Sequence, residues 1–386
     1  MTGAAGFALR NLSGSAAREP GTVEILVQSF GTALALGILA DIFLTVLYVR
    51  GGAAWLSPQI NLAVWAGFRA AARLFPSASG RLLSFCGPAL LALVPSVWVV
   101  LLVMGFALIF WPELGRSVCA AEGPTDTSFA TAVYFSGLSL TTLGTGDIVP
   151  VTGPARLLMV IESALGFSVL TLSLTYFLSV YGAVERRNAF ALDLHHRSAE
   201  TGDAAELVAR WGATGRFDGV EAELSAMAGR VFDLLESHHS HTVLHYFRFP
   251  EPHLTAPRVL LLAADAASLL RSVPDPAVHR RLLRSGGLAA LWGGTLQMLA
   301  DLSRSGPTPS PSSTPADAEV AWVRRYAAAR NRLAAEGVAV IPDEAAGAEA
   351  YARCRREWDA ALRGLAAHIG EKWSDIDRAA GPSAPQ

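Results

Sequence analysis

The sequence of 386 residues contains few charged side chains for its length. Asp, Glu, Lys and Arg make up 17% of the chain and hydrophobic residues 52%, whereas a soluble protein carries about a quarter charged residues. The formal net charge of −2 offers no excess of positive charge for nucleic acid. The composition therefore argues against a nucleic-acid-binding protein and favours a protein that lies in a membrane.

Cysteine is also scarce, with three residues that lie far apart: Cys86, Cys119 and Cys354. Their spacing fits neither a disulfide framework nor a CxxC metal site. Cys119 lies in a loop that the charge distribution places outside the membrane. We expect a free thiol there, with an inter-subunit disulfide as the alternative.

The sequence lacks the patterns of common enzyme and sensor sites. No run alternates apolar and polar residues as a half-buried strand does, and the glycines of residues 212–219 follow no strand, which argues against a nucleotide-binding loop. No nucleophile–base constellation and no ladder of arginines is present. We therefore predict neither an enzyme nor a voltage sensor, and no organic cofactor.

Three apolar runs are long enough to cross a bilayer: residues 29–49, 89–110 and 156–181. The first is interrupted by Asp41, which we expect to pack against the other spans with its carboxylate bonded to a hydroxyl. A fourth apolar stretch, residues 129–142, is too short to span the bilayer. It indicates a re-entrant half-helix.

The arginine residues indicate how the spans are oriented. Residues 50–88 contain four arginines and no acid, whereas residues 111–126 contain three acids and one arginine. By the positive-inside rule, residues 50–88 and the C-terminal region are cytoplasmic, and residues 111–126 and the N-terminus are outside. Residues 53–75 are amphipathic, and we expect them to lie along the inner membrane surface.

The run TTLGTGDIVP, residues 141–150, stands between two membrane-spanning stretches. Irregular backbone at membrane depth is tolerated only where it is buried in protein or lines a water-filled path. Gly144 and Gly146 readily adopt positive φ, which lets successive carbonyl groups face one axis and replace the water shell of a cation. Asp147 adds a negative rim at the outer end. The run therefore predicts an ion-selectivity filter.

Residues 129–167, FATAVYFSGLSLTTLGTGDIVPVTGPARLLMVIESALGF, resemble the pore module of the potassium channel family, with its pore helix, TxGxGD signature and inner helix. The resemblance covers residues 89–181. It implies that K⁺ is the permeant ion and that four identical chains assemble around one axis. It implies that Gly166 is the hinge of the inner helix. The filter residues it implies are Thr142, Leu143, Gly144, Thr145 and Gly146.

Two positions depart from the family pattern. Thr145 stands where the family has an aromatic residue, which braces the filter against pore-helix aromatics at the positions of Tyr134 and Phe135. Leu138 stands where some members have a carboxylate that pairs with the aspartate after the filter, here Asp147. These changes predict a more loosely braced filter, so a weakly selective or nonselective cation channel is the alternative.

Glu162 lies on the inner helix, one turn before Gly166. An ionisable group inside a span needs a partner or water. We expect Glu162 either to face the back of the pore helix and bond Ser139 or Thr141, or to approach the cavity below Thr142.

Four apolar side chains recur at helical spacing on the inner helix: Phe167, Leu170, Leu174 and Leu178. The family resemblance places them toward the cavity and the inner mouth. Rings of leucine would form a hydrophobic constriction that gates by dewetting. We predict a gate at Leu174 or Leu178, with core packing or lipid contact as the alternative.

Five of the nine histidines cluster in residues 236–253, ESHHSHTVLHYFRFPEPH. His241 and His245 would share one face of a helix, which suits a metal ion. Proton sensing near neutral pH is one alternative, and ordinary packing or solvation is another.

We predict an all-α, multi-pass membrane protein: a pore-loop, potassium-channel-like homotetramer with an extra N-terminal span and a helical cytoplasmic domain. We expect it in the plasma membrane of a bacterial cell, in contact with lipid, monovalent cations and an unidentified cytoplasmic regulator. A non-conducting membrane sensor that acts through its soluble domain is a further alternative. The predicted segments are an N-terminal segment (1–28), a first span (29–52), an amphipathic cytoplasmic segment (53–88), a pore domain (89–182), a helical domain (183–302), a disordered linker (303–318) and a C-terminal helical segment with a tail (319–386).

Overall fold

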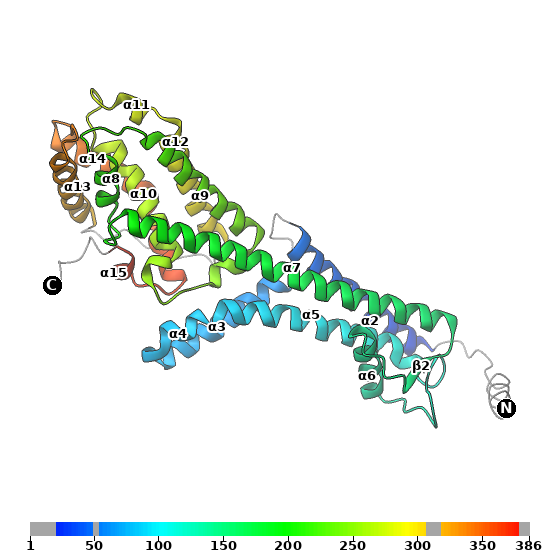
Figure 1. Ribbon diagram of the computed structural model, residues 1–386. Helices are drawn as coiled ribbons and strands as arrows, with labels where there is room; N and C mark the ends of the chain where they lie inside the picture. Colours follow the sequence, from blue (N-terminus) through cyan, green and yellow to red (C-terminus); the bar gives the residue numbers. More distant parts are fainter. Residues whose placement is uncertain (1–20, 49–53, 306–317, 378–386) are drawn as a thin grey trace. The chain divides into compact units, whose positions relative to one another are not determined.

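A computed structural model describes residues 21–48, 54–305 and 318–377, and within these ranges the elements are helices apart from one pair of short strands (Figure 1). The all-α class is therefore confirmed, and the strands are a small addition that the sequence pattern did not indicate. The chain forms two compact units. The first holds residues 21–48, 54–57 and 92–176, and the second holds residues 58–91, 177–305 and 318–377.

Three helices of the described chain are long and apolar enough to cross a membrane. They are α2 (Thr22–Ile42), which continues into the π-helical turn η1 (Phe43–Leu47), α5 (Cys86–Phe110) and α7 (Gly153–Arg197). The first span begins before the predicted residue 29, because the Glu24 carboxylate accepts a hydrogen bond from the Gly21 amide at 3.3 Å and closes the first turn there.

Helix α7 is a single element of 45 residues, from Gly153 to Arg197. The predicted boundary between pore domain and helical domain at residue 182 thus falls inside a continuous helix. The change in composition there does not end the helix, because residues 183–197 are rich in good helix formers and contain neither proline nor glycine.

Asp41 in α2 is fully buried and accepts hydrogen bonds from four donors. Its Oδ1 accepts from the amides of Trp55 (3.0 Å) and Leu56 (2.8 Å). Its Oδ2 accepts from the Ser57 hydroxyl (2.6 Å) and the Trp98 indole (3.0 Å). The expected hydroxyl partner is confirmed. Because every carboxylate oxygen is bonded, the acid in the first span is stabilised by protein groups rather than by water.

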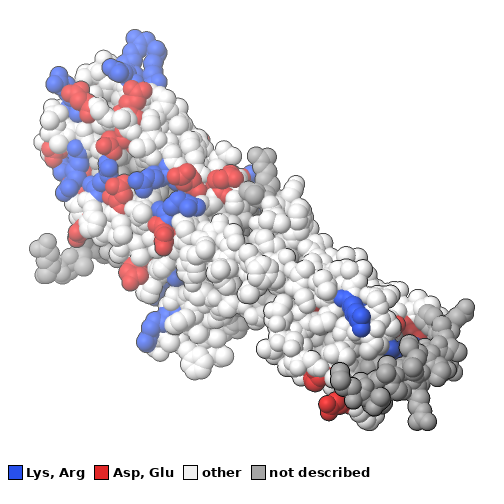
Figure 2. All heavy atoms as spheres, turned by 45° about the vertical axis from the view of Figure 1, so that its right-hand side comes forward, with Lys and Arg blue, Asp and Glu red and all other residues white. Residues whose placement is uncertain are grey.

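The second unit is built from helices. Its first part comprises α3 (Ser57–Leu74), η2 (Pro76–Ala78) and α4 (Ser79–Ser84). After α7 it comprises α8 (Ala204–Trp211), α9 (Val220–Ser240), η4 (Thr242–Tyr246), η5 (Pro252–Leu254), α10 (Ala256–Ser272), α11 (Arg280–Leu283), α12 (Gly286–Ser305), α13 (Ala318–Ala335), α14 (Glu344–His368) and α15 (Trp373–Ile376). The predicted linker 303–318 lies outside the described residues except at its two ends, which are helical. On the face that Figure 2 shows, charged side chains gather over this unit.

Helix α10 is the centre of the second unit, and its side chains are buried along almost its whole length. Helices α8, α12 and α14 pack against it. Its sequence is mostly leucine and alanine, which explains why no single polar face is visible in it. The one acid in α10 is Asp265, which is fully buried.

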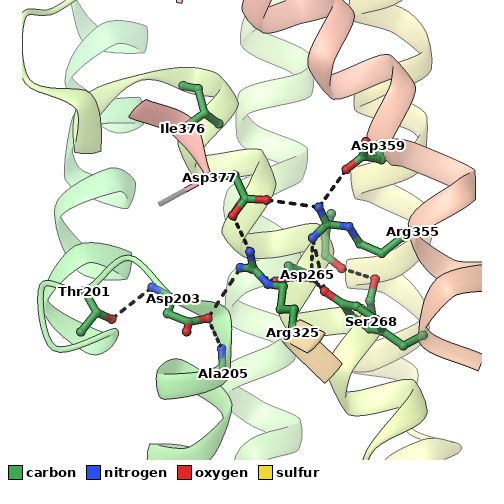
Figure 3. Close-up of polar contacts among 12 residues, drawn as sticks. Thr201, Asp203, Ala205, Asp265, Ser268, Arg325, Arg355, Asp359, Ile376 and Asp377 are labelled. Atoms are coloured by element: carbon green, nitrogen blue, oxygen red, sulfur yellow. Dashed lines mark hydrogen bonds and ion pairs between the residues drawn. The ribbon is translucent and has the colours of Figure 1, made fainter. Parts of the chain in front are cut away.

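Asp265 is the centre of a buried ionic network (Figure 3). Its carboxylate contacts Arg325 of α13 at 2.7 Å and Arg355 of α14 at 3.1 Å, and accepts a hydrogen bond from the Tyr351 hydroxyl at 2.5 Å. Both guanidinium groups also bond Asp377, which follows α15. The network therefore ties two helices, α13 and α14, and the last described residue to the central helix.

We predict that Asp265→Asn destabilises the second unit by about 3 kcal/mol, because removing one charge from a buried ion network leaves its partners unpaired. The matched control is Asp218→Asn, whose salt bridge to Arg216 (3.3 Å) lies between side chains that are 75% and 77% exposed. The control should cost less than about 0.5 kcal/mol. Chemical unfolding of the purified protein measures both values, and equal losses would contradict the central role of Asp265.

Candidate ion-conduction site

The half-helix before the filter run is α6 (Phe129–Leu140), and its N-terminus is capped. The Ser128 hydroxyl accepts a hydrogen bond from the Thr131 amide at 3.4 Å. Asp126 accepts from the Thr131 hydroxyl at 2.6 Å and from the Ser128 amide at 3.0 Å, and these bonds lower the pKa of Asp126. A carboxylate and a serine at this end satisfy the orphan amides and match the positive end of the helix dipole.

The chain turns sharply where α6 ends. The Thr142 amide donates to the Ser139 carbonyl at 3.1 Å, and the Leu143 amide donates to the Leu138 carbonyl at 3.0 Å. These bonds use the last carbonyl groups of the helix. The backbone of Thr142 and Leu143, the first two residues of the predicted filter, is therefore hydrogen-bonded to the end of α6.

Positive φ values alternate along the predicted filter: Thr142 has φ 57°, Gly144 has φ 56° and Gly146 has φ 78°. Such alternation turns successive peptide groups the same way, so that carbonyl groups align on one side of the chain. Thr142 is β-branched, and a positive φ in such a residue costs about 1–3 kcal/mol. All residues from Thr142 to Asp147 are exposed in the single chain. The strain is thus held at an exposed surface, where a role in binding would explain it.

A two-stranded antiparallel ladder holds the outer end of this run. Strand β1 (Val118–Ala120) pairs with β2 (Ile148–Pro150), and Cys119 is opposite Val149. The Ala121 amide donates to the Asp147 carbonyl at 2.8 Å. The thiol of Cys119 is free within the chain, and its pairing with another copy stays a prediction.

Tyr134 reaches from α6 to the outer end of the predicted filter. Its hydroxyl donates to Asp147 Oδ2 at 3.0 Å and lies 3.5 Å from Thr145 Oγ1. The Thr145 hydroxyl also donates to Asp147. Both hydroxyl groups lower the pKa of Asp147, and the Thr145 hydroxyl has the larger effect. A polar triad of Tyr134, Thr145 and Asp147 thus braces this segment, where the sequence predicted a loose brace.

Phe135 and Leu138 of α6 are buried within the chain. Phe135 is 1% exposed and packs edge-on against Phe110 of α5, with ring centroids 5.0 Å apart. The support that Phe135 and Leu138 were expected to give the filter from the pore helix stays a prediction, and within the chain Phe135 contacts α5. This contact anchors α6.

Glu162 of α7 is fully buried, and its Oε1 lies 2.5 Å from the Ser136 hydroxyl. The expected position of Glu162 behind α6 is confirmed, but its partner is Ser136 rather than Ser139 or Thr141, because the register of the two packed helices differs from the expected one. The Ser139 carbonyl instead accepts from the Ser163 hydroxyl at 2.9 Å, and the Thr141 hydroxyl bonds the Gly137 carbonyl. Glu162 therefore joins α7 to the back of α6, and the alternative that it lines the cavity is wrong.

Gly166 marks the closest approach of α7 to α6. A Cβ atom added there would lie 1.9 Å from the Leu140 carbonyl oxygen. Helix α7 runs without interruption through this position. The structure thus explains the glycine by contact, and the hinge implied by the family resemblance stays a prediction.

A known protein family matches the part of the chain that contains α6 and the predicted filter. Residues 96–182 match the sequence model of a family described as "Ion channel". This part of the chain is an ion-channel domain. The match confirms the resemblance that the filter run and its flanking helices indicated.

A protein of Bacillus subtilis (strain 168), described as "Uncharacterized membrane protein YdjJ", is 29% identical to this chain over 212 residues. The alignment covers 54% of this chain and 59% of that protein, so the chain spans little more than half of the relative's length. No solved structure matches the chain significantly. The relative supports a membrane protein and adds no ligand.

Helix α7 presents an exposed apolar stripe within the ion-channel domain. Its members are between 59% and 69% exposed in the single chain: Phe167, Leu170, Leu174 and Leu178. Exposed leucines at helical spacing fit a surface that faces a pore, lipid or another copy of the chain. Core packing within the chain is ruled out for them.

The predicted metal pair is wrong. Helix α9 ends at Ser240, so His241 and His245 do not share an α-helical face. His241 Nε2 lies 2.8 Å from the Ser179 hydroxyl, and His245 packs edge-on against His238 with ring centroids 4.8 Å apart. In the part of the chain that the structure describes, no group of three or more potential ligands is placed to hold a metal ion.

We predict that Gly166→Ala destabilises the ion-channel domain by about 2 kcal/mol or more, because the new methyl group forces α7 away from the Leu140 carbonyl. The control is Gly182→Ala on the same helix, where a Cβ would lie 3.5 Å from the Arg186 side chain, an ordinary contact. Thermal unfolding of the purified protein compares the variants. A Gly166→Ala protein as stable as the Gly182→Ala protein would show that the close approach is not required.

Proposed function

We propose that this protein is a potassium channel that conducts passively through a filter formed by residues 142–146. The observation that carries the proposal is the alternating positive φ of Thr142, Gly144 and Gly146 at the end of a capped half-helix between two spans. An aligned row of carbonyl groups can replace the water shell of a dehydrated cation. Passive conduction needs no chemical step, which accords with a non-enzymatic role.

The proposed channel is a tetramer of identical chains. Each chain supplies one pore loop, and a ring of carbonyl groups around a cation needs four such loops. The exposed residues 142–147 and the exposed stripe on α7 are the surfaces that other copies would face. The proposal places residues 183–386 in the cytoplasm of a bacterial cell and the Asp147 carboxylates at the outer mouth, where they would concentrate cations.

A weakly selective cation channel is the second candidate. Thr145 and Leu138 favour it, because both lack the groups that brace the family's filter. The hydrogen bond from Tyr134 to Asp147 favours selectivity, since a filter held at its outer end keeps its spacing.

The reversal potential distinguishes the two candidates. The purified protein is placed in a planar bilayer with potassium on one side and sodium on the other. We expect a value close to the potassium equilibrium potential, and loss of current in Gly144→Ala, whose φ of 56° disfavours any side chain. A potential near zero with robust current would establish the weakly selective channel. No current under any condition would favour a non-conducting sensor.

We predict that Leu174→Asn leaves the closed channel leaky, with a roughly tenfold higher open probability at rest, because a polar ring lets water fill a hydrophobic constriction. Leu174 is 59% exposed in the single chain. Leu157→Asn makes the same change at another exposed position of α7 (63%) and should leave the resting current low. Single-channel recording compares them, and an unchanged closed state in Leu174→Asn would place the gate elsewhere.

A further inference from the structure

A small cavity of about 20 Å³ lies inside the second unit. Its lining includes Arg187 of α7, His238 of α9, His245 of η4 and Glu371, which follows α14. A cavity of this size holds one or two water-sized groups. Segments far apart in the chain therefore meet at a space that a small ligand can fill.

Arg187 is 4% exposed and has an unused hydrogen-bonding edge. Its Nη1 donates to the Phe247 carbonyl at 3.1 Å, and its guanidinium lies over the Phe249 ring at 5.4 Å from the centroid. Its Nε and Nη2 have no hydrogen-bond partner among the described residues. These two nitrogens form the side-on edge that grips anions with two parallel N–H bonds.

The carboxylate in the cavity wall does not neutralise Arg187. Glu371 pairs with Arg248, whose Nε lies 2.8 Å from Glu371 Oε1. No carboxylate of the described residues lies within salt-bridge distance of Arg187. A buried guanidinium without a counter-charge is costly, and a water molecule in the cavity would satisfy its N–H groups without neutralising it.

The other polar groups of the wall also favour an anion. His238 is 7% exposed and its Nδ1 has no partner among the described residues. Burial lowers the pKa of His238 and lowers that of His245 to about 4, so both rings are neutral at pH 7 and can donate one N–H each. Thr255 and Ala256 bring the N-terminal end of α10 to the cavity, and that end has no side-chain cap.

We propose that this cavity binds a small monovalent anion of the size of chloride or formate, held by the free edge of Arg187 and by His238, and that the anion regulates conduction through α7. Arg187 and Leu174 belong to one continuous helix. A ligand that fixes Arg187 against α9 and α10 therefore restrains the helix that carries the exposed leucines. The regulatory part rests on the proposed channel function, and the binding part does not.

The first experiment measures binding without conduction. The purified full-length protein is heated in potassium chloride, formate or gluconate at equal concentration, so that only the anion differs and gluconate is too large for the cavity. We expect a saturable rise of Tm in chloride, formate or both, by about 3 °C at ten times the Kd, and none in gluconate. A rise in one salt alone identifies a halide or a carboxylate. Equal Tm values in all three salts would overturn the site.

Variants distinguish this site from a general effect of salt. Arg187→Gln removes the guanidinium group with its two free N–H donors, and Arg187→Lys keeps the positive charge without these donors. Both variants should therefore bind the anion at least tenfold more weakly. The second variant carries the test if the first does not fold. The matched control is Arg186→Gln, because Arg186 is the exposed neighbour on the same helix, and it should keep the wild-type rise. A full rise in a folded Arg187 variant would overturn the assignment.

Tracer rubidium flux into liposomes then tests the regulation, with the same three salts and the Arg187→Lys variant. We expect at least a threefold difference in flux between the effective anion and gluconate in the wild type, and none in the variant. Equal flux in all salts from a protein whose Tm responds would overturn the regulatory part alone. Absence of flux in every salt would overturn the channel function and the regulation with it, while the Tm series still decides the anion site.

Discussion

The structure depends on one constraint: backbone groups at membrane depth must be hydrogen-bonded or must face water. Three helices satisfy it internally. The run after α6 satisfies it only at its ends, where Leu143 bonds the helix and the Asp147 carbonyl accepts from Ala121. The exposed residues between those ends have backbone carbonyl groups that can bind a ligand, and a permeating cation would be such a ligand.

The same constraint explains the ionisable side chains of the first unit. Asp41 has four donors, and Glu162 contacts Ser136. Each acid therefore connects two segments of the chain and takes part in packing rather than in conduction. Tyr134 does the same at the outer end by joining α6 to Asp147. The predicted filter segment is therefore held at Asp147 by a side chain of α6.

The second unit contains buried arginines of two kinds: some are paired with carboxylates, and one is not. Around Asp265, two arginines are each paired with aspartates within one network of buried side chains (Figure 3), which makes that network structural. Arg187 is buried as deeply and lacks a counter-charge among the described residues. The contrast matters because proteins rarely bury an unpaired guanidinium without a ligand to meet it. An anion at Arg187 would act on α7, a helix that runs through both units.

The sequence by itself determined the spans, the half-helix, the glycine-rich run and the resemblance to ion channels, because each depends on local properties: hydropathy over about 20 residues, glycine at positions of positive φ, and charge in short loops. It missed the contacts made between helices. Ser136 rather than Ser139 meets Glu162, Phe135 faces Phe110, and α9 ends before His241. Only the tertiary structure decided these, because partners across a helix interface depend on the rotation and register of two packed helices, and a shift of one residue turns a side chain by about 100°.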